Sequence, residues 1–158
     1  MVSGLAGSRR AEPQKGAATY AVRCCRQRCR DGVARAERFD MAVLEAYEPI
    51  EQRWQGRVSE LDVAVDEIPR IAARNPENIQ WPPEVIADGP IALARLIPAG
   101  VDVRSNATRA RIVLFRKPIE RRAQDTVELG ELLHDLLVAQ VATYLDVDPS
   151  VIDPTIDD

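Results

Sequence analysis

The sequence has few of the side chains on which most catalytic and metal-binding sites depend. Its 158 residues include a single histidine, His134, and three cysteines. Cys24, Cys25 and Cys29 are so close together that none can cross-link the later segments, which argues against a disulfide scaffold. They also lack a fourth ligand and a nearby histidine, so we expect no zinc site there. One histidine must serve any serine or cysteine mechanism, and such chemistry is therefore not favoured.

Long apolar runs and several common motifs are also missing. No run approaches the roughly 20 apolar residues of a membrane-spanning helix. The first residues, MVSGLAG, lack the apolar core of about 7 to 15 residues found in secretory signals. We therefore expect no membrane partner and a cytoplasmic location. The sequence contains no Gly-x-Ser-x-Gly, no Gly-x-Gly-x-x-Gly after a strand and no phosphate-binding loop with lysine, so enzyme classes built on those motifs are unsupported.

Charge is divided unevenly along the chain. The net charge is −4, yet residues 1–38 hold nine basic residues against three acidic ones, which leaves −10 for residues 39–158. Residues 1–38 have little apolar periodicity and are predicted to form a disordered basic tail. An interaction protein with a nucleic-acid-binding tail is an alternative, but we do not favour it because basic termini are commonly just solvated. Residues 39–158 are long enough for one domain with a real core.

The pattern of residues 39–123 alternates between helix and strand signals. Apolar residues at helical spacing from Phe39 predict an amphipathic helix, interrupted near Pro49. Strict alternation over 61–68 predicts a strand with one buried face. Five prolines between positions 69 and 90 predict a long surface loop. Two further strands are expected around 91–97 and 110–117, joined by a turn-rich, hairpin-like connection over 100–108.

The last predicted element is a long helix. Asp125 followed by Glu128 has the form of a capping box and marks its start. From Leu136 onward the helix is apolar nearly all round, so we expect it to be buried on several sides. The fold class is therefore α+β, with a short mixed sheet of about three to four strands packed against an N-terminal helix and a buried C-terminal helix.

Three segments together resemble a known family. They are RIVLFRKPIERRA at 111–123, DTVELGELLHDLL at 125–137 and VAQVATYLDVDPSVID at 138–153. In combination they resemble the bacterial, actinobacterial-type family of zincin-like metallopeptidases, in which a strand ending in Arg-x-Pro-hydrophobic-Glu precedes a zinc-binding helix. The resemblance covers roughly residues 39–153 and implies a small, minimal zincin-like domain.

The family's helix carries His-Glu-x-x-His, followed closely by glycine. Two histidines at i and i+4 grip Zn²⁺ from one helix face, while the glutamate takes a proton from the zinc-bound water. The resemblance aligns Ala139 with the first histidine, Gln140 with the glutamate, Thr143 with the second histidine and Asp146 with the glycine. Every functional position of the motif is therefore changed.

These changes remove the atoms that the chemistry requires. Ala139 has no lone pair for a metal, and a threonine such as Thr143 is a poor zinc ligand. Gln140 keeps the shape of glutamate, but its amide accepts no proton near neutral pH. We expect a catalytically inactive pseudopeptidase with no catalytic residue, no bound zinc and no other cofactor, retained as a peptide- or protein-binding module.

The main alternative is an active metallopeptidase with an unconventional metal site. It would draw on His134 and on the acids Asp146, Asp148 and Asp153. His134 has Val138 at i+4, however, so no second ligand shares its helix face.

Two arginines in the strand before the helix are candidates for a binding groove. Arg109 and Arg111 share one face of that strand. They could line a groove beside the helix that holds an extended peptide or protein partner. The alternative is that these charges protect an edge strand against aggregation.

Overall fold

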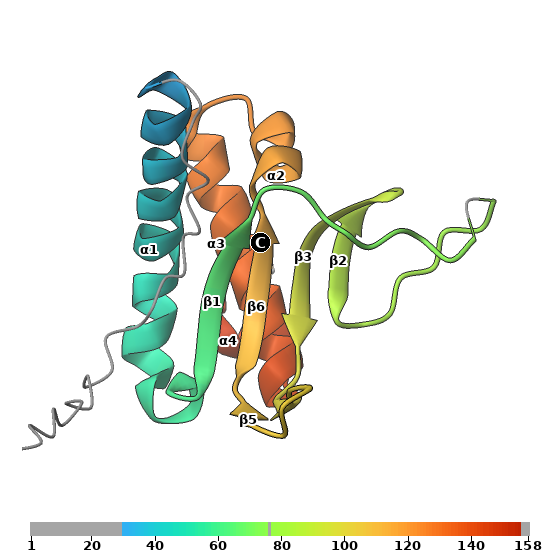
Figure 1. Cartoon of the computed structure of the whole chain (residues 1–158). Coiled ribbons are helices and arrows are strands. Elements are labelled where there is room, and N and C mark those ends of the chain that lie inside the picture. The colour runs from blue at the N-terminus through green and yellow to red at the C-terminus, as the bar shows by residue number, and fades with distance from the viewer. Residues whose placement is uncertain (1–29, 76, 156–158) are drawn as a thin grey trace, which may run out of the picture.

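The computed structural model describes residues 30–75 and 77–155, in which helices pack on a four-stranded mixed sheet and two short strands form a separate pair (Figure 1). In chain order the elements are α1 (Arg30–Val58), β1 (Leu61–Asp66), β2 (Val85–Asp88), β3 (Ile91–Ile97), β4 (Gly100–Val101), β5 (Ala107–Thr108), β6 (Ala110–Phe115), α2 (Arg116–Arg122), α3 (Thr126–Leu145) and α4 (Pro149–Ile152). None of the helices in this part of the chain is long and apolar enough to cross a membrane.

The main sheet has four strands in the order β1-β6-β3-β2. β1 and β6 are parallel and pair from Leu61 opposite Ala110 to Asp66 opposite Phe115. β3 runs antiparallel to both β6 and β2. The predicted α+β class and the predicted mixed sheet of three to four strands are therefore confirmed. The short pair β4 and β5 forms the hairpin-like connection expected over 100–108.

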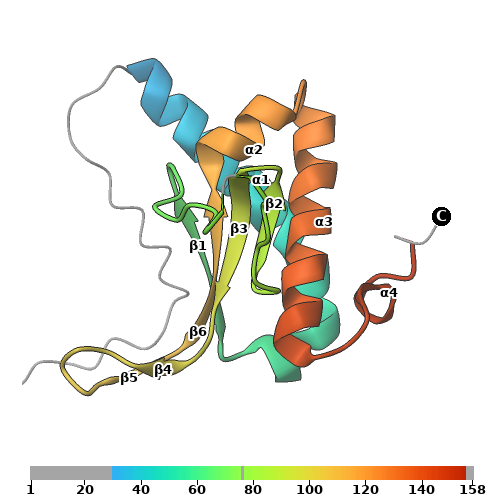
Figure 2. The ribbon, with the colours of Figure 1, turned by 90° about the vertical axis from the view of Figure 1, so that its right-hand side faces the viewer.

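Helices α1 and α3 cover one face of the sheet, and the other face carries no helix among the described residues (Figure 2). Alternation along β6 assigns its side chains to these two faces. Ala110, Ile112 and Leu114 are buried towards the helices, whereas Arg111 is exposed on the opposite face. We call this second surface the helix-free face.

Helix α3 lies at the centre of the core. Leu133, Leu137, Val138 and Val141 have no exposed surface, as expected for a helix that is apolar on nearly all sides. Its start matches the predicted cap, because the Asp125 carboxylate accepts hydrogen bonds from the backbone N–H groups of the second and third helical residues at 2.9 and 2.8 Å. The buried C-terminal helix and its N-cap were therefore predicted correctly.

The first helix differs from the prediction in two respects. It begins at Arg30, so residues 30–38, assigned to the tail, are helical. The rest of the predicted tail, with the three cysteines, lies outside the described residues. The helix also continues through Pro49, and its backbone leaves helical geometry only at Trp54, with φ −115° and ψ 17°. Pro49 forfeits one backbone hydrogen bond, but Tyr47 and Ile50 are buried in the core and keep the helix continuous.

Three short elements were missed. β2 has only four residues and lies inside the predicted loop of 69–90, where prolines mask its signal. Helix α2 begins directly after β6, so that strand ends at Phe115 and not at Lys117. Pro118 is tolerated there because it lies in the first helical turn. α4 is a single turn that is capped by Asp148.

Candidate functional site on helix α3

The positions that the sequence resemblance aligned with the zinc ligands lie on the second half of α3. Ala139 is half-buried and Thr143 is exposed, one turn apart on the same helix face. The Thr143 hydroxyl donates a hydrogen bond to the backbone carbonyl of Ala139 at 2.9 Å. The polar atom at the second ligand position is therefore already bonded within its own helix. We call Ala139 and Thr143 the exposed stripe of α3.

Gln140 points away from this stripe and into the core. It is fully buried and is the only buried polar residue in the part of the chain that the structure describes. Its Nε2 donates to the backbone carbonyl of Glu84 at 3.3 Å, and its Oε1 has no partner. The same carbonyl accepts a hydrogen bond from the Leu96 N–H at 2.7 Å. Gln140 therefore packs against the start of β2, and its orphaned acceptor costs about 1 to 3 kcal/mol.

The residues at these positions do not fit a zinc ion. Zinc sites take histidine, cysteine or carboxylate ligands. Ala139 offers no donor atom, and Thr143 offers only a neutral hydroxyl that is already engaged. Within residues 30–75 and 77–155 no group of three or more histidine, cysteine, aspartate or glutamate side chains is arranged to hold a metal.

Asp146 ends α3 in a left-handed conformation, with φ 53° and ψ 49°. Its N–H bonds back to the carbonyl of Thr143 at 3.3 Å, and the Val147 N–H bonds to that of Ala142 at 3.0 Å. This closure resembles the helix ends at which glycine is preferred, because glycine has no Cβ to clash in this region. Asp146 is the position that the resemblance aligned with the family's glycine, and its left-handed conformation is one that glycine adopts without strain.

Asp146→Gly should raise the free energy of unfolding by about 0.5 to 1 kcal/mol, because the left-handed conformation is strained for residues other than glycine. Urea unfolding monitored by circular dichroism measures the change. Asp148→Gly is the matched control and should destabilise instead, since the Asp148 carboxylate accepts hydrogen bonds from Ser150 at the start of α4. A loss of stability in Asp146→Gly would mean that the carboxylate itself supports the helix end.

The single histidine, His134 of α3, contacts one residue of α1 and one residue that follows α4. His134 Nε2 lies 2.6 Å from Asp153 Oδ2, and Nδ1 lies 3.4 Å from the carbonyl oxygen of Ala46. Both partners are acceptors, so only the doubly protonated ring can donate to both. Hydrogen bonds from the Thr155 backbone and from His134 lower the pKa of Asp153 to about 2. A depressed carboxyl pKa stabilises the fold above about pH 4, and that contribution disappears as the pH falls towards 2.

The four residues of the alternative metal site are therefore not brought together as a set. His134 and Asp153 meet, but they bond to each other. Asp146 ends α3, and the Asp148 carboxylate caps α4.

The two arginines proposed for a groove lie elsewhere on the sheet. Arg109 forms ion pairs with Glu60 at 3.3 Å and Asp62 at 3.7 Å, and donates a further hydrogen bond to the Ser59 carbonyl. Arg111 is exposed on the helix-free face, so the sheet separates it from α3. β6 lies between β1 and β3, which makes the idea that these charges protect an edge strand wrong.

A family model described as zincin-like metallopeptidase matches residues 58–156. The match begins at the end of α1 and takes in the whole sheet, α2, α3 and α4. No curated protein matches the chain.

Proposed function

The chain belongs to the family of zincin-like metallopeptidases, and from that membership we propose that it is a pseudopeptidase, which binds no zinc, cleaves no peptide bond and serves as a peptide- or protein-binding module. The observation that carries the proposal is the state of α3. Its motif-equivalent residues are an alanine, a buried amide and a threonine whose hydroxyl bonds to its own helix.

Peptide hydrolysis by a zincin needs three contributions from this helix. Two imidazoles hold the metal, and a carboxylate accepts a proton from the metal-bound water. Ala139 and Thr143 supply no imidazole. Gln140 supplies no base, and its buried amide faces the Glu84 carbonyl instead of the exposed stripe. The chain therefore lacks the groups for zinc binding and the group for proton transfer. Loss of both supports a peptide-binding role over that of a weakened enzyme.

The binding role draws support from the strand beside Gln140. β2 is the last strand of the sheet, so one of its edges has no strand partner in the described chain. An extended peptide can add to such an edge through main-chain hydrogen bonds. The exposed stripe adds only two small side chains, Ala139 and Thr143, to the surface of α3.

Metal content of the purified, dialysed protein tests the proposal. We expect far less than one zinc per chain and no cleavage of an unfolded protein substrate, with or without added zinc. About one tightly bound zinc per chain, together with hydrolysis that a chelator abolishes, would overturn it. Should zinc be retained, the His134→Ala variant distinguishes the alternative site: loss of the metal in that variant would assign it to His134.

A further inference from the structure

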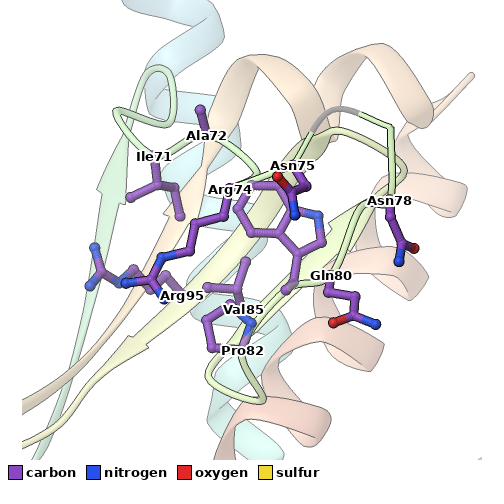
Figure 3. Close-up of a pocket in the computed structure, with 10 residues that line it drawn as sticks. Ile71, Ala72, Arg74, Asn75, Asn78, Gln80, Pro82, Val85 and Arg95 are labelled. Carbon is purple, nitrogen blue, oxygen red and sulfur yellow. The ribbon is translucent and has the colours of Figure 1, made fainter.

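A pocket of about 610 Å³ lies on the helix-free face, on the opposite side of the sheet from the exposed stripe of α3 (Figure 3). Val85 of β2 and Arg95 of β3 pair in register and form one side of it. The loop between β1 and β2 forms the other. Its volume falls within the range of about 300 to 1,000 Å³ typical of ligand sites. The lining residues are Ile71, Ala72, Arg74, Asn75, Asn78, Gln80, Trp81, Pro82, Val85 and Arg95.

The charge in this pocket is all of one sign. Among the described residues that line it, Arg74 and Arg95 are the only charged ones, and no acidic side chain accompanies them. Neither forms an ion pair within the described chain, in contrast to Arg116 and Arg122, which pair with Glu67 and Asp88. Figure 3 shows the two side chains, one from the loop and one from β3, extending towards the same side of the pocket. Two unpaired guanidinium groups brought together in this way favour an anion between them.

The remaining lining is apolar or amide. Ile71, Pro82 and Val85 provide hydrocarbon surface. Trp81 adds an aromatic ring, whose position is fixed because its Nε1 donates to the Gly89 carbonyl at 2.9 Å. The side-chain amides of the lining can both donate to and accept from peptide groups.

This composition suits a peptide better than a nucleic acid. Nucleic acids are held through many phosphate contacts along a basic surface. Here the two arginines stand in a domain whose net charge over residues 39–158 is −10. Guanidinium groups beside apolar walls instead match a carboxylate attached to a hydrocarbon stem.

We infer that this pocket binds a carboxylate-bearing peptide segment. Arg74 and Arg95 hold the carboxylate, the apolar side chains receive its hydrocarbon part, and the amides bond the adjoining peptide groups. The inference rests on the proposed role as a peptide-binding module, for which it names a site and a ligand class. It does not depend on the loss of peptidase activity, since the pocket and α3 lie on opposite faces of the sheet.

Calorimetric titration of the full chain with three acetylated tetrapeptides of otherwise identical sequence tests this site. The first ends in glutamate with an amidated terminus, the second in glutamine with a free terminal carboxylate, and the third in amidated glutamine. The charged peptides should bind about tenfold or more tightly than the neutral one, because only they form charge-assisted hydrogen bonds. Comparing the first two shows whether a side-chain or a terminal carboxylate is preferred. The affinity should fall as salt is added.

Arg95→Gln should weaken binding of the preferred charged peptide by about tenfold while leaving the neutral peptide unaffected. Arg104→Gln is the matched control, because it removes the same charge from an exposed site on the hairpin outside the pocket. Circular dichroism establishes that each variant is folded.

Three outcomes would overturn the inference. The first is equal affinity for charged and neutral peptides, and the second is no detectable binding of any peptide up to about 1 mM. The third is a single-stranded oligonucleotide that binds more tightly than the peptides and loses affinity in Arg95→Gln, which would assign the pocket to nucleic acid. None of these results bears on zinc content or hydrolysis, so the proposed loss of peptidase activity is tested separately from this site.

Discussion

Gln140→Glu is expected to lower the free energy of unfolding by about 2 to 4 kcal/mol at pH 7. The side chain at this position has no exposed surface. A carboxylate there loses its hydration and can no longer donate to the Glu84 carbonyl, which would face a negative charge instead of an N–H group. The family's general base would therefore be an unpaired buried charge in this chain.

The pH dependence of the free energy of unfolding shows whether Gln140→Glu destabilises the fold through its charge or through its shape. Burial disfavours the charged form, so the pKa of the introduced glutamate should be higher in the folded than in the unfolded chain. The folded state then binds more protons, and the deficit relative to wild type should be small near pH 4 and grow as the pH rises, until the folded-state pKa is passed. Urea unfolding of both proteins from pH 4 to pH 8 measures this divergence.

Gln140→Met is the matched control for Gln140→Glu. It keeps the length of the side chain and removes the orphaned acceptor together with the long hydrogen bond to Glu84. We expect a change of about 1 kcal/mol or less, independent of pH. If Gln140→Glu were as stable as wild type at pH 7, water or a cation would have to reach this position, and the burial described for Gln140 would be wrong.

Ala139→His combined with Thr143→His should create a zinc site on the exposed stripe of α3. The two positions are one helical turn apart on one accessible face, which is the spacing at which paired histidines chelate zinc. We expect a dissociation constant in the region of 10 μM, and therefore about 2.7 kcal/mol of added stability at 1 mM zinc. Thermal unfolding with and without zinc measures the shift.

The single variants are the controls for this pair. Ala139→His alone and Thr143→His alone each supply one imidazole and should show little zinc-dependent stabilisation. A folded double variant that gains no more than the singles would mean that positions 139 and 143 do not share an accessible face. The residue-by-residue alignment of α3 with the zinc-binding helix would then be shifted. Membership of the family would be unaffected, because it depends on the match over residues 58–156.

Local patterns were enough to predict the larger elements. Alternation located β1, helical spacing and a capping box located α3, and Asp125 does cap that helix. These signals succeed because each depends on residues within one or two turns of one another. The local sequence pattern was less informative where an element is stabilised by residues that are distant in the sequence. β2 is held by its pairing with β3, and α1 runs through Pro49 because its neighbours are buried.

The sequence by itself determined what α3 lacks. The absence of imidazole at 139 and 143 and of carboxylate at 140 is a matter of composition, and no arrangement of the backbone can restore those atoms. It also determined the α+β class, because strand and helix periodicities are properties of short segments.

Only the tertiary structure decided what those residues touch. It buried Gln140 against Glu84, joined His134 to Asp153, and placed Arg95 beside Arg74 in one pocket. Each of these contacts links residues at least 19 positions apart. Such contacts depend on strand order and on which face of the sheet the helices cover, and neither is encoded in the period of a single segment.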